Sequence, residues 1–231
     1  MQTLLNPNLT SDCLHLGCGL TAPNDWLNVD GSLQIVFARR PRLKRALVKL
    51  GVYPRSQAAI PWPTNVLRLN LQKQLPFPDA SFIAVYSSHT FEHLFRDDAL
   101  TLARECYRVL SSKGVCRIVV PDLGAAVQKY LKDSNQGVNA DSAADQFMDE
   151  LLVHPRAPKS GLLGLYHRTL GYHQHKWMYD ANSLNKLLID AGFSDVTNPH
   201  CQEGRLPRLL QIENPSRGEA GVGVIAEGIK P

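Results

Sequence analysis

Two runs of apolar residues without polar alternation constrain the fold of this chain most. Phe82–Tyr86 reads Phe-Ile-Ala-Val-Tyr, and Ile118–Val120 reads Ile-Val-Val. Such runs are typical of strands buried on both faces, as in a parallel sheet that helices cover. The full set of predicted strands is Cys13–Leu16, Trp26–Val29, Val66–Leu71, Phe82–Ser87, Val115–Val120, Asp195–Thr197 and Val222–Ala226.

Helical patterns lie between these strands. Within Asp98–Leu110 the apolar residues fall on one face, and Asp97 or Asp98 is expected to cap the helix. Asp180–Ala191 has the same pattern, with Asp180 as its predicted N-cap. Strands that alternate with helices predict an α/β, Rossmann-like, doubly wound sheet.

The length of 231 residues suits one domain, which we expect to span residues 1–231 with insertions at about 31–63 and 134–178. Five cysteines without a Cys-x-x-Cys spacing favour a reducing compartment over a disulfide framework. No signal peptide is predicted, and no apolar run is long enough to span a bilayer. A cytoplasmic location is expected.

A glycine turn and an acid follow the first two strands. Leu14–Gly19 is a strand that runs into a Gly-x-Gly turn, where side chains would block a ligand from the backbone. Asp30 closes the next strand, and a carboxylate there can accept hydrogen bonds from both hydroxyls of a ribose. Together they predict a nucleoside site.

The dinucleotide fingerprint is a competing interpretation, because Gly17-x-Gly19-x-x-Ala22 also fits it. That fingerprint requires a helix after the glycines and an acid about twenty residues further on. Asp30 follows Gly19 too closely, and Pro23-Asn24-Asp25 interrupts the segment. The spacing therefore favours S-adenosylmethionine (SAM), which has no pyrophosphate, over NAD.

Several ordered motifs together resemble the class I SAM-dependent methyltransferases, and most closely the type 11-like group. The motifs are Leu14–Gly19, Trp26–Asp30, Leu75–Phe82, Tyr86–His89, Phe91–Leu94 and Tyr107–Leu110. The resemblance implies a seven-stranded sheet that is mostly parallel with an antiparallel last strand and has helices on both faces. It also implies that SAM lies across the carboxyl ends of the first four strands.

The resemblance assigns cofactor contacts residue by residue. The implied cofactor-binding residues are Gly17, Cys18 and Gly19 at the methionine part, Asp30 at the ribose, Asn70 and Leu71 at the adenine, and Ser88 and His89 beside the methionine moiety. Asn70 departs from the family, in which an aspartate is common at that strand end.

Methyl transfer requires mainly that acceptor, methyl group and sulfur are aligned, but a hydroxyl acceptor also needs a base. His89 and His93 follow the fourth strand and are the candidate bases. Asp122 follows the fifth strand and is a candidate to orient an imidazole, or else a plain helix cap. Glu92 and His93 could alternatively be a polar pair at the start of a helix.

A segment rich in histidines and aromatics follows the fifth predicted strand, and we interpret it as a lid that binds the acceptor. Its candidate substrate-binding residues are Arg168, Tyr172, His173, His175 and Trp177. A surface loop with solvated histidines is the alternative. A metal site of His167, His173 and His175 is not expected, because the spacing matches no zinc pattern.

Positive charge is concentrated in residues 39–55. This stretch has seven basic residues with no acid between them: Arg39, Arg40, Arg42, Lys44, Arg45, Lys49 and Arg55. Apolar residues recur in it at helical spacing, so it could contact an anionic membrane surface or a phosphate-bearing substrate, or be a solvated helix face. Nucleic acid is not expected, because no aromatic platform is interleaved.

Three functions fit these features. The first is methyl transfer from SAM to an oxygen or nitrogen of a small molecule or of a sugar or glycan precursor. The second is a SAM-binding module without turnover. The third is an RNA or protein methyltransferase recruited through the basic helix.

Overall fold

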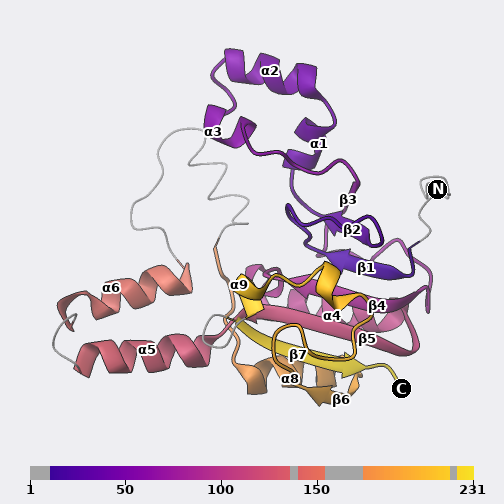
Figure 1. The fold of residues 1–231 in the computed structure, drawn as a ribbon, viewed down its shortest axis with the longest axis vertical. Helices are drawn as coiled ribbons and strands as arrows, with labels where there is room; N and C mark the ends of the chain where they lie inside the picture. Colours follow the sequence, from indigo (N-terminus) through magenta and orange to yellow (C-terminus); the bar gives the residue numbers. More distant parts are fainter. Residues whose placement is uncertain (1–10, 136–139, 154–173, 219–222) are drawn as a thin grey trace.

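Seven strands form one sheet in the computed structural model, which describes residues 11–135, 140–153, 174–218 and 223–231. The spatial order is β3-β2-β1-β4-β5-β7-β6. The strands are β1 Cys13–Leu16, β2 Leu27–Asp30, β3 Val66–Arg68, β4 Phe82–Ser88, β5 Leu110–Pro121, β6 Ser194–Thr197 and β7 Gly223–Ile229. All seven predicted strands overlap these elements (Figure 1).

The pairing confirms the predicted mixed sheet. β1 pairs in parallel with β2 and β4, β2 with β3, and β4 with β5. β7 is antiparallel to both of its neighbours, β5 and β6. The carboxyl ends of β1, β2 and β4 therefore meet at one edge of the sheet, where a ligand can reach all three.

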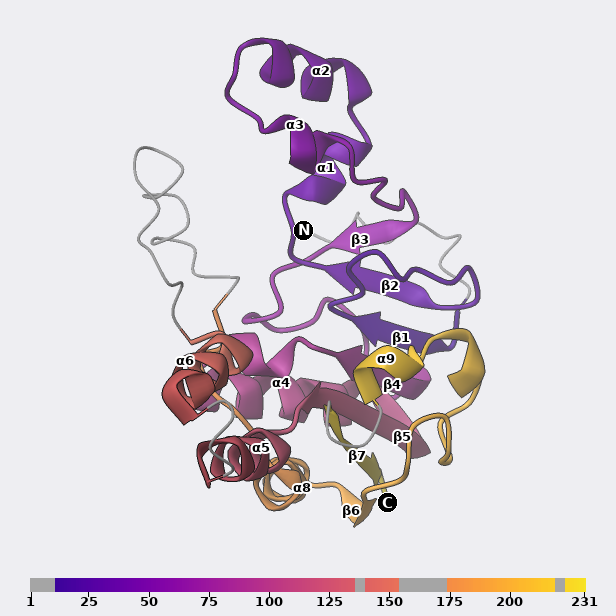
Figure 2. The same ribbon diagram turned by 60° about the vertical axis from the view of Figure 1, so that its left-hand side comes forward.

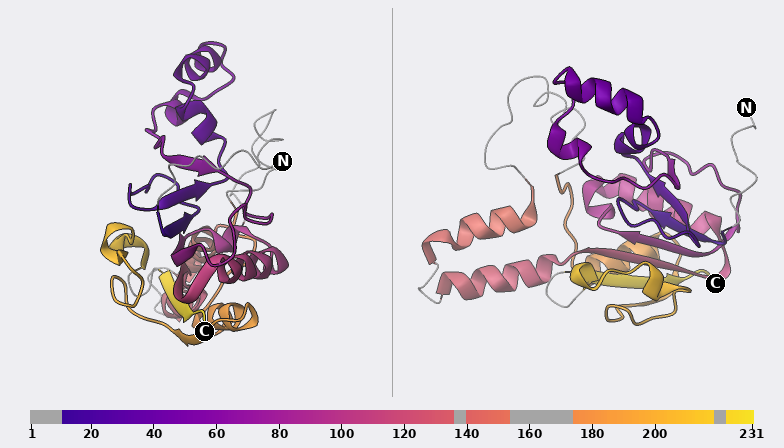
Figure 3. Two further views of the ribbon diagram at one scale, coloured as in Figure 1. Left: turned by 90° about the vertical axis from the view of Figure 1, so that its right-hand side faces the viewer. Right: turned by 45° about the horizontal axis from the view of Figure 1, so that its top comes forward.

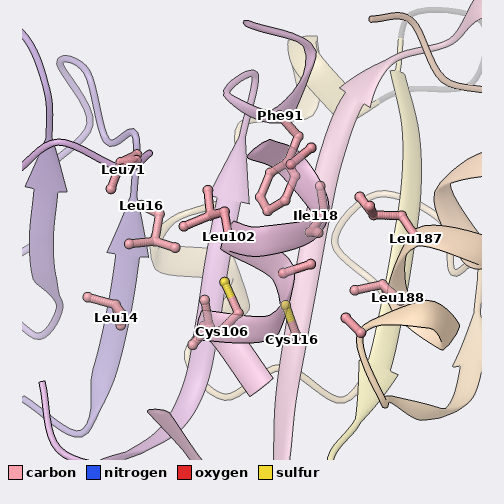
Figure 4. Close-up of a cluster of buried hydrophobic side chains, with 14 of the residues drawn as sticks. Leu14, Leu16, Leu71, Phe91, Leu102, Cys106, Cys116, Ile118, Leu187 and Leu188 are labelled. Carbon is pink, nitrogen blue, oxygen red and sulfur yellow. The ribbon is translucent and has the colours of Figure 1, made fainter. Parts of the chain in front are cut away.

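The main core lies between the sheet and two long helices. These are α4 (Arg96–Val109) and α8 (Ala181–Asp190). Figure 4 shows Leu102 and Cys106 of α4 and Leu187 and Leu188 of α8 against side chains of the sheet, all of them buried. The apolar periodicity of both helices thus meets the uninterrupted apolar runs of the central strands.

A long irregular segment with short helices covers the opposite face of the sheet. Side chains that alternate with the main-core residues, such as Cys13 and Tyr86, pack there against Leu206, Leu209 and Ile212. This segment includes η2 (Leu209–Gln211) and α9 (Pro215–Gly218).

Two groups of helices project from the sheet (Figures 1 and 3). The first contains α1 (Gln34–Ala38), α2 (Pro41–Lys49) and α3 (Arg55–Ala58), which fall within the predicted insertion at 31–63. The second pairs α5 (Leu123–Asn135) with α6 (Ala140–Leu151). The second projection begins before residue 134, because α5 continues directly from the end of β5. Figure 2 shows α1–α3 beyond the β3 edge of the sheet and the α5–α6 pair to one side of it, near α4 and α8.

The capping predictions had different outcomes. Asp180 caps α8 as predicted, and its carboxylate accepts a hydrogen bond from the Ser183 backbone N–H at 2.8 Å. The predicted cap of the earlier helix was wrong, because α4 already begins at Arg96 and Asp97 and Asp98 lie in its first turn. In the first turn their negative charges interact favourably with the positive end of the helix dipole, but they do not cap the helix.

No helix in the described ranges combines the length and the apolarity that crossing a membrane requires.

Candidate active site

The bend after β1 and the acid after β2 are in direct contact. The Gly19 backbone N–H donates to Asp30 Oδ2 at 2.9 Å, and the Ser32 N–H donates to Asp30 Oδ1 at 2.7 Å. Each carboxylate oxygen keeps a second lone pair, because an ionised carboxylate has about four acceptor sites. The two neighbouring strand tips thus lie together, as the predicted nucleoside cradle requires.

Both glycines of the bend have left-handed backbone conformations, with φ of 67° at Gly17 and 55° at Gly19. A Cβ on Gly17 would lie 1.8 Å from Thr90 Oγ1, because the Thr90 side chain already occupies this space. A Cβ on Gly19 would meet no atom within 4 Å. Of the two, Gly19 is therefore the glycine that leaves the cradle open.

A shallow hollow adjoins this bend. It is lined by Gly17 and Cys18 after β1 and by Ser88 at the end of β4. Asn214 and Arg217 of the segment that covers the opposite face line its other side. Three of the residues assigned to the cofactor thus line one hollow, and the segment around α9 narrows it.

The two residues assigned to the adenine differ in their surroundings. Leu71 is buried in the main core, so its side chain packs with Leu16 (Figure 4). Asn70 is exposed, and its side-chain oxygen accepts a hydrogen bond from the Gln72 N–H at 3.0 Å. Because the Leu71 side chain is in the core, Leu71 can contact a cofactor only through its backbone.

The turn after β4 brings a buried carboxylate against histidines. η1 (Phe91–His93) contains Glu92, which is fully buried. His89 Nδ1 lies 3.3 Å from Glu92 Oε1, and His93 Nε2 lies 3.9 Å from the same oxygen. His89 itself has a left-handed φ of 53°, a conformation that recurs at functional sites, and its N–H is held by the Val119 carbonyl at 2.9 Å.

The described part of the predicted lid segment, just before α8, packs onto this turn. His175 is buried, and its Nε2 lies 4.0 Å from Glu92 Oε1. Lys176 and Trp177 donate backbone hydrogen bonds to the Glu92 carbonyl at 2.7 and 3.2 Å. Burial lowers the pKa of His175, which keeps this imidazole neutral.

The other lid residues have different positions. The Trp177 side chain is 45% exposed and does not enter the cluster. Arg168, Tyr172 and His173 lie outside the described residues.

For Asp122 the structure agrees with the second of the two interpretations, a plain helix cap. Its Oδ1 accepts hydrogen bonds from the N–H groups of Gly124 and Ala125 at 2.8 and 3.2 Å, so it caps α5. The carboxylate beside the histidines is Glu92, to which the sequence assigned no chemistry. The available signal was its position between His89 and His93 directly after a buried strand.

The mixed α/β sheet, with a glycine bend and a carboxylate at adjoining strand tips, agrees with the class that the comparisons show: the chain is a class I methyltransferase that uses SAM. Residues 14–118 match a family model described as a methyltransferase domain, of type 11. The matched part covers β1 to β5 and includes Asp30, His89 and Glu92.

Solved structures with low sequence identity are similar to the chain. A SAM-dependent methyltransferase from Thermotoga maritima, described as a possible histamine N-methyltransferase, is 16% identical over 95% of this chain and 82% of its own, with a TM-score of 0.46. One from Archaeoglobus fulgidus is 16% identical over 94% and 85%, with a TM-score of 0.48. One from Mesorhizobium loti is 15% identical over 94% and 90%, with a TM-score of 0.44. No curated protein matches the chain.

Proposed function

We propose that the chain transfers the methyl group of SAM to an oxygen or nitrogen of a small molecule or of a sugar or glycan precursor. The observation behind this proposal is the contact between His89 Nδ1 and the buried Glu92 Oε1 at 3.3 Å, directly after β4. A hydroxyl acceptor needs a base, and an imidazole oriented by a carboxylate is the usual one. Here His89 is the base, Glu92 its positioning residue, and His93 the alternative base.

The state of His89 supports this assignment. Its Nε2 is buried and has no hydrogen-bond partner within the described part of the chain. With Nδ1 turned toward Glu92, the proton is favoured on Nδ1 and the lone pair on Nε2. That lone pair is available to an acceptor hydroxyl or ammonium group.

The cofactor contacts are tested without knowledge of the acceptor, by calorimetric titration with S-adenosylhomocysteine. Asp30→Asn removes the charge that we assign to the ribose hydroxyls. A charge-assisted contact of about 1.5–3 kcal/mol corresponds to binding that is roughly ten- to a hundredfold weaker. Asp25→Asn, at an exposed site before β2 and beside Ser11 at the other end of these strands, is the control. Equal affinity in wild type and Asp30→Asn would refute the cradle.

The acceptor class is tested by release of S-adenosylhomocysteine with panels of sugars, hydroxylated and aminated small molecules, RNA and protein. We expect turnover with a member of the first panels and a loss of about a hundredfold or more in kcat for His89→Gln. His200→Gln, at an exposed histidine outside the site, should keep full activity. Turnover on RNA or protein alone would contradict the proposal, and binding without turnover on any panel would favour the non-catalytic module.

The basic helix supports a further partner, an anionic lipid surface. α2 buries none of its residues, and Leu43 and Leu50 are 41% and 73% exposed. Its cations Arg42, Lys44 and Arg45 form no salt bridge with any described residue. No acidic residue occurs between Gly31 and Pro78. An exposed apolar stripe flanked by cations is the pattern that lies in a lipid interface.

Sedimentation with vesicles tests this contact. Phosphatidylcholine vesicles with phosphatidylserine should bind the protein, and pure phosphatidylcholine should not. The triple variant Arg42→Gln, Lys44→Gln, Arg45→Gln should bind roughly a hundredfold more weakly, at about 1 kcal/mol per cation. The control neutralises three lysines on α5 and α8: Lys129→Gln, Lys132→Gln and Lys186→Gln. Equal binding by both variants would contradict a role for α2.

Arg39 is left intact in these variants for a structural reason. Its guanidinium donates to the backbone carbonyls of Val66 and Thr64 at 2.6 and 3.3 Å, so it ties the projection to strand β3. If Arg39 were neutralised, weaker vesicle binding could come either from the lost charge or from a displaced projection.

A further inference from the structure

Glu92 is a buried carboxylate without the partners that such a group normally has. Its side chain is fully buried, and neither oxygen accepts a hydrogen bond within the described ranges. An ionised carboxylate in such a place is costly unless a cation or several donors compensate it. The site therefore lacks a positive charge.

Three imidazoles surround one oxygen of this carboxylate. Glu92 Oε1 lies 3.3 Å from His89 Nδ1, 3.9 Å from His93 Nε2 and 4.0 Å from His175 Nε2. His93 and His175 come from distant parts of the sequence, and their rings pack edge to face with centroids 5.1 Å apart. One potential ligand atom from each of Glu92, His93 and His175 lies within 4.8 Å of the other two.

The second nitrogen of His93 is held as in a metal-binding histidine. Its Nδ1 lies 3.2 Å from the Gln174 carbonyl oxygen, which can only accept, so Nδ1 carries the proton and donates it. The lone pair is then on Nε2, the atom that faces Glu92. Histidine ligands of metals usually donate their other N–H to a carbonyl or carboxylate in this way.

We propose that Glu92, His93 and His175 bind a divalent transition-metal ion, with Zn²⁺ as the best fit. Two imidazoles and one carboxylate suit such an ion, whereas Mg²⁺ and Ca²⁺ favour oxygen ligands alone. A tetrahedral zinc ion with ligands at about 2.0–2.1 Å holds the ligand atoms about 3.4 Å apart, which small side-chain rotations bring within reach. Three protein ligands leave a fourth position open.

This site differs from the set of three histidines considered in the sequence. The spacing of His167, His173 and His175 gave no expectation of a metal site; His175 is part of the present cluster, and His167 and His173 lie outside the described residues. The proposal also goes beyond methyl transfer, because metal uptake requires neither SAM nor an acceptor. A failure of the metal site and a failure of the proposed activity are therefore separate results.

The test is metal binding by the full chain, purified without a histidine tag and stripped with a chelator. Calorimetry with Zn²⁺ should give one equivalent per chain, and Co²⁺ should give the visible absorption of a tetrahedral site. Bound Zn²⁺ should also raise the melting temperature. Glu92→Gln and His93→Gln should each abolish the saturable equivalent, and His200→Gln, an exposed histidine, should retain it.

His93→Gln is the more decisive of these variants, because its side chain is 26% exposed and its replacement leaves the core intact. Circular dichroism and thermal unfolding verify that the variant is folded. The proposal is overturned if the wild type binds no stoichiometric ion, if folded His93→Gln binds as well as the wild type, or if His200→Gln loses binding equally.

Discussion

Gly17 and Gly19 occupy one bend for different physical reasons. Both have φ in the left-handed region, where a Cβ costs about 1–2 kcal/mol. Gly17 in addition faces the Thr90 side chain, and Gly19 faces open space. One glycine therefore serves packing and the other serves access to the cofactor.

Alanine substitutions should separate these two roles. Gly17→Ala should lower the free energy of unfolding by about 3 kcal/mol, because strain and overpacking add. Gly19→Ala should cost about 1 kcal/mol and mainly weaken binding of S-adenosylhomocysteine. Urea unfolding and calorimetry measure the two effects. The double variant Gly17→Ala, Thr90→Gly should recover stability, and no recovery would show that Thr90 is not the obstacle.

His15 should make the stability of the protein depend on pH. It is buried beside Trp26 and Tyr86, and burial lowers its pKa from 6.5 to about 3. The unfolded chain takes up this proton first as the pH falls, so the stabilisation is complete above pH 6.5 and is lost between pH 6.5 and about 3.

By proton linkage, the free energy of unfolding should fall by about 1.4 kcal/mol for each pH unit that the pH is lowered within that window. Urea unfolding of the wild type between pH 7 and pH 5 should show it, and His15→Gln should show a slope that is smaller by this amount. His200→Gln, an exposed histidine, should leave the slope unchanged. Identical slopes for wild type and His15→Gln would contradict this account.

At the scale of elements, one arginine joins strand β5 to the segment that covers it. Arg117 is fully buried and forms two hydrogen bonds of 2.7 Å to the Glu213 carboxylate. It also contacts Glu227 of β7 at 3.2 Å and donates to the carbonyls of Glu203 and His200. These bonds hold the irregular segment against strand β5.

Removal of Arg117 should be strongly destabilising, because it leaves Glu213 buried without its cation and Glu227 with Arg205 as its remaining cationic partner. For Arg117→Met we expect a loss of about 3–5 kcal/mol in the free energy of unfolding. The triple variant Arg117→Met, Glu213→Gln, Glu227→Gln should recover part of it. Lys186→Met, which breaks an exposed ion pair with Asp190, should cost less than about 1 kcal/mol. Similar losses for the two single variants would disprove the special position of Arg117.

For the whole molecule, the local patterns predicted the strands, the mixed sheet and the proximity of the glycine bend to Asp30. These features follow from apolar periodicity and from residues close in sequence, such as Gly19 and Asp30. The cluster of Glu92 with His175 depends on a contact between distant segments, for which one sequence has no local signal. Arg117 was missed for a related reason: its partners come from three remote places, and within an apolar run it resembles a surface position.

Strand β7 lies between β5 and β6 in the sheet, although both precede it in the chain. During synthesis, β5 and β6 therefore cannot pair with β7, which joins them in the sheet, until residue 229 has left the ribosome. Until then the edge of β5 stays unpaired, and Arg117 lacks Glu227. The nascent chain thus passes through an aggregation-prone intermediate with an unpaired strand edge, the kind of species that chaperones bind.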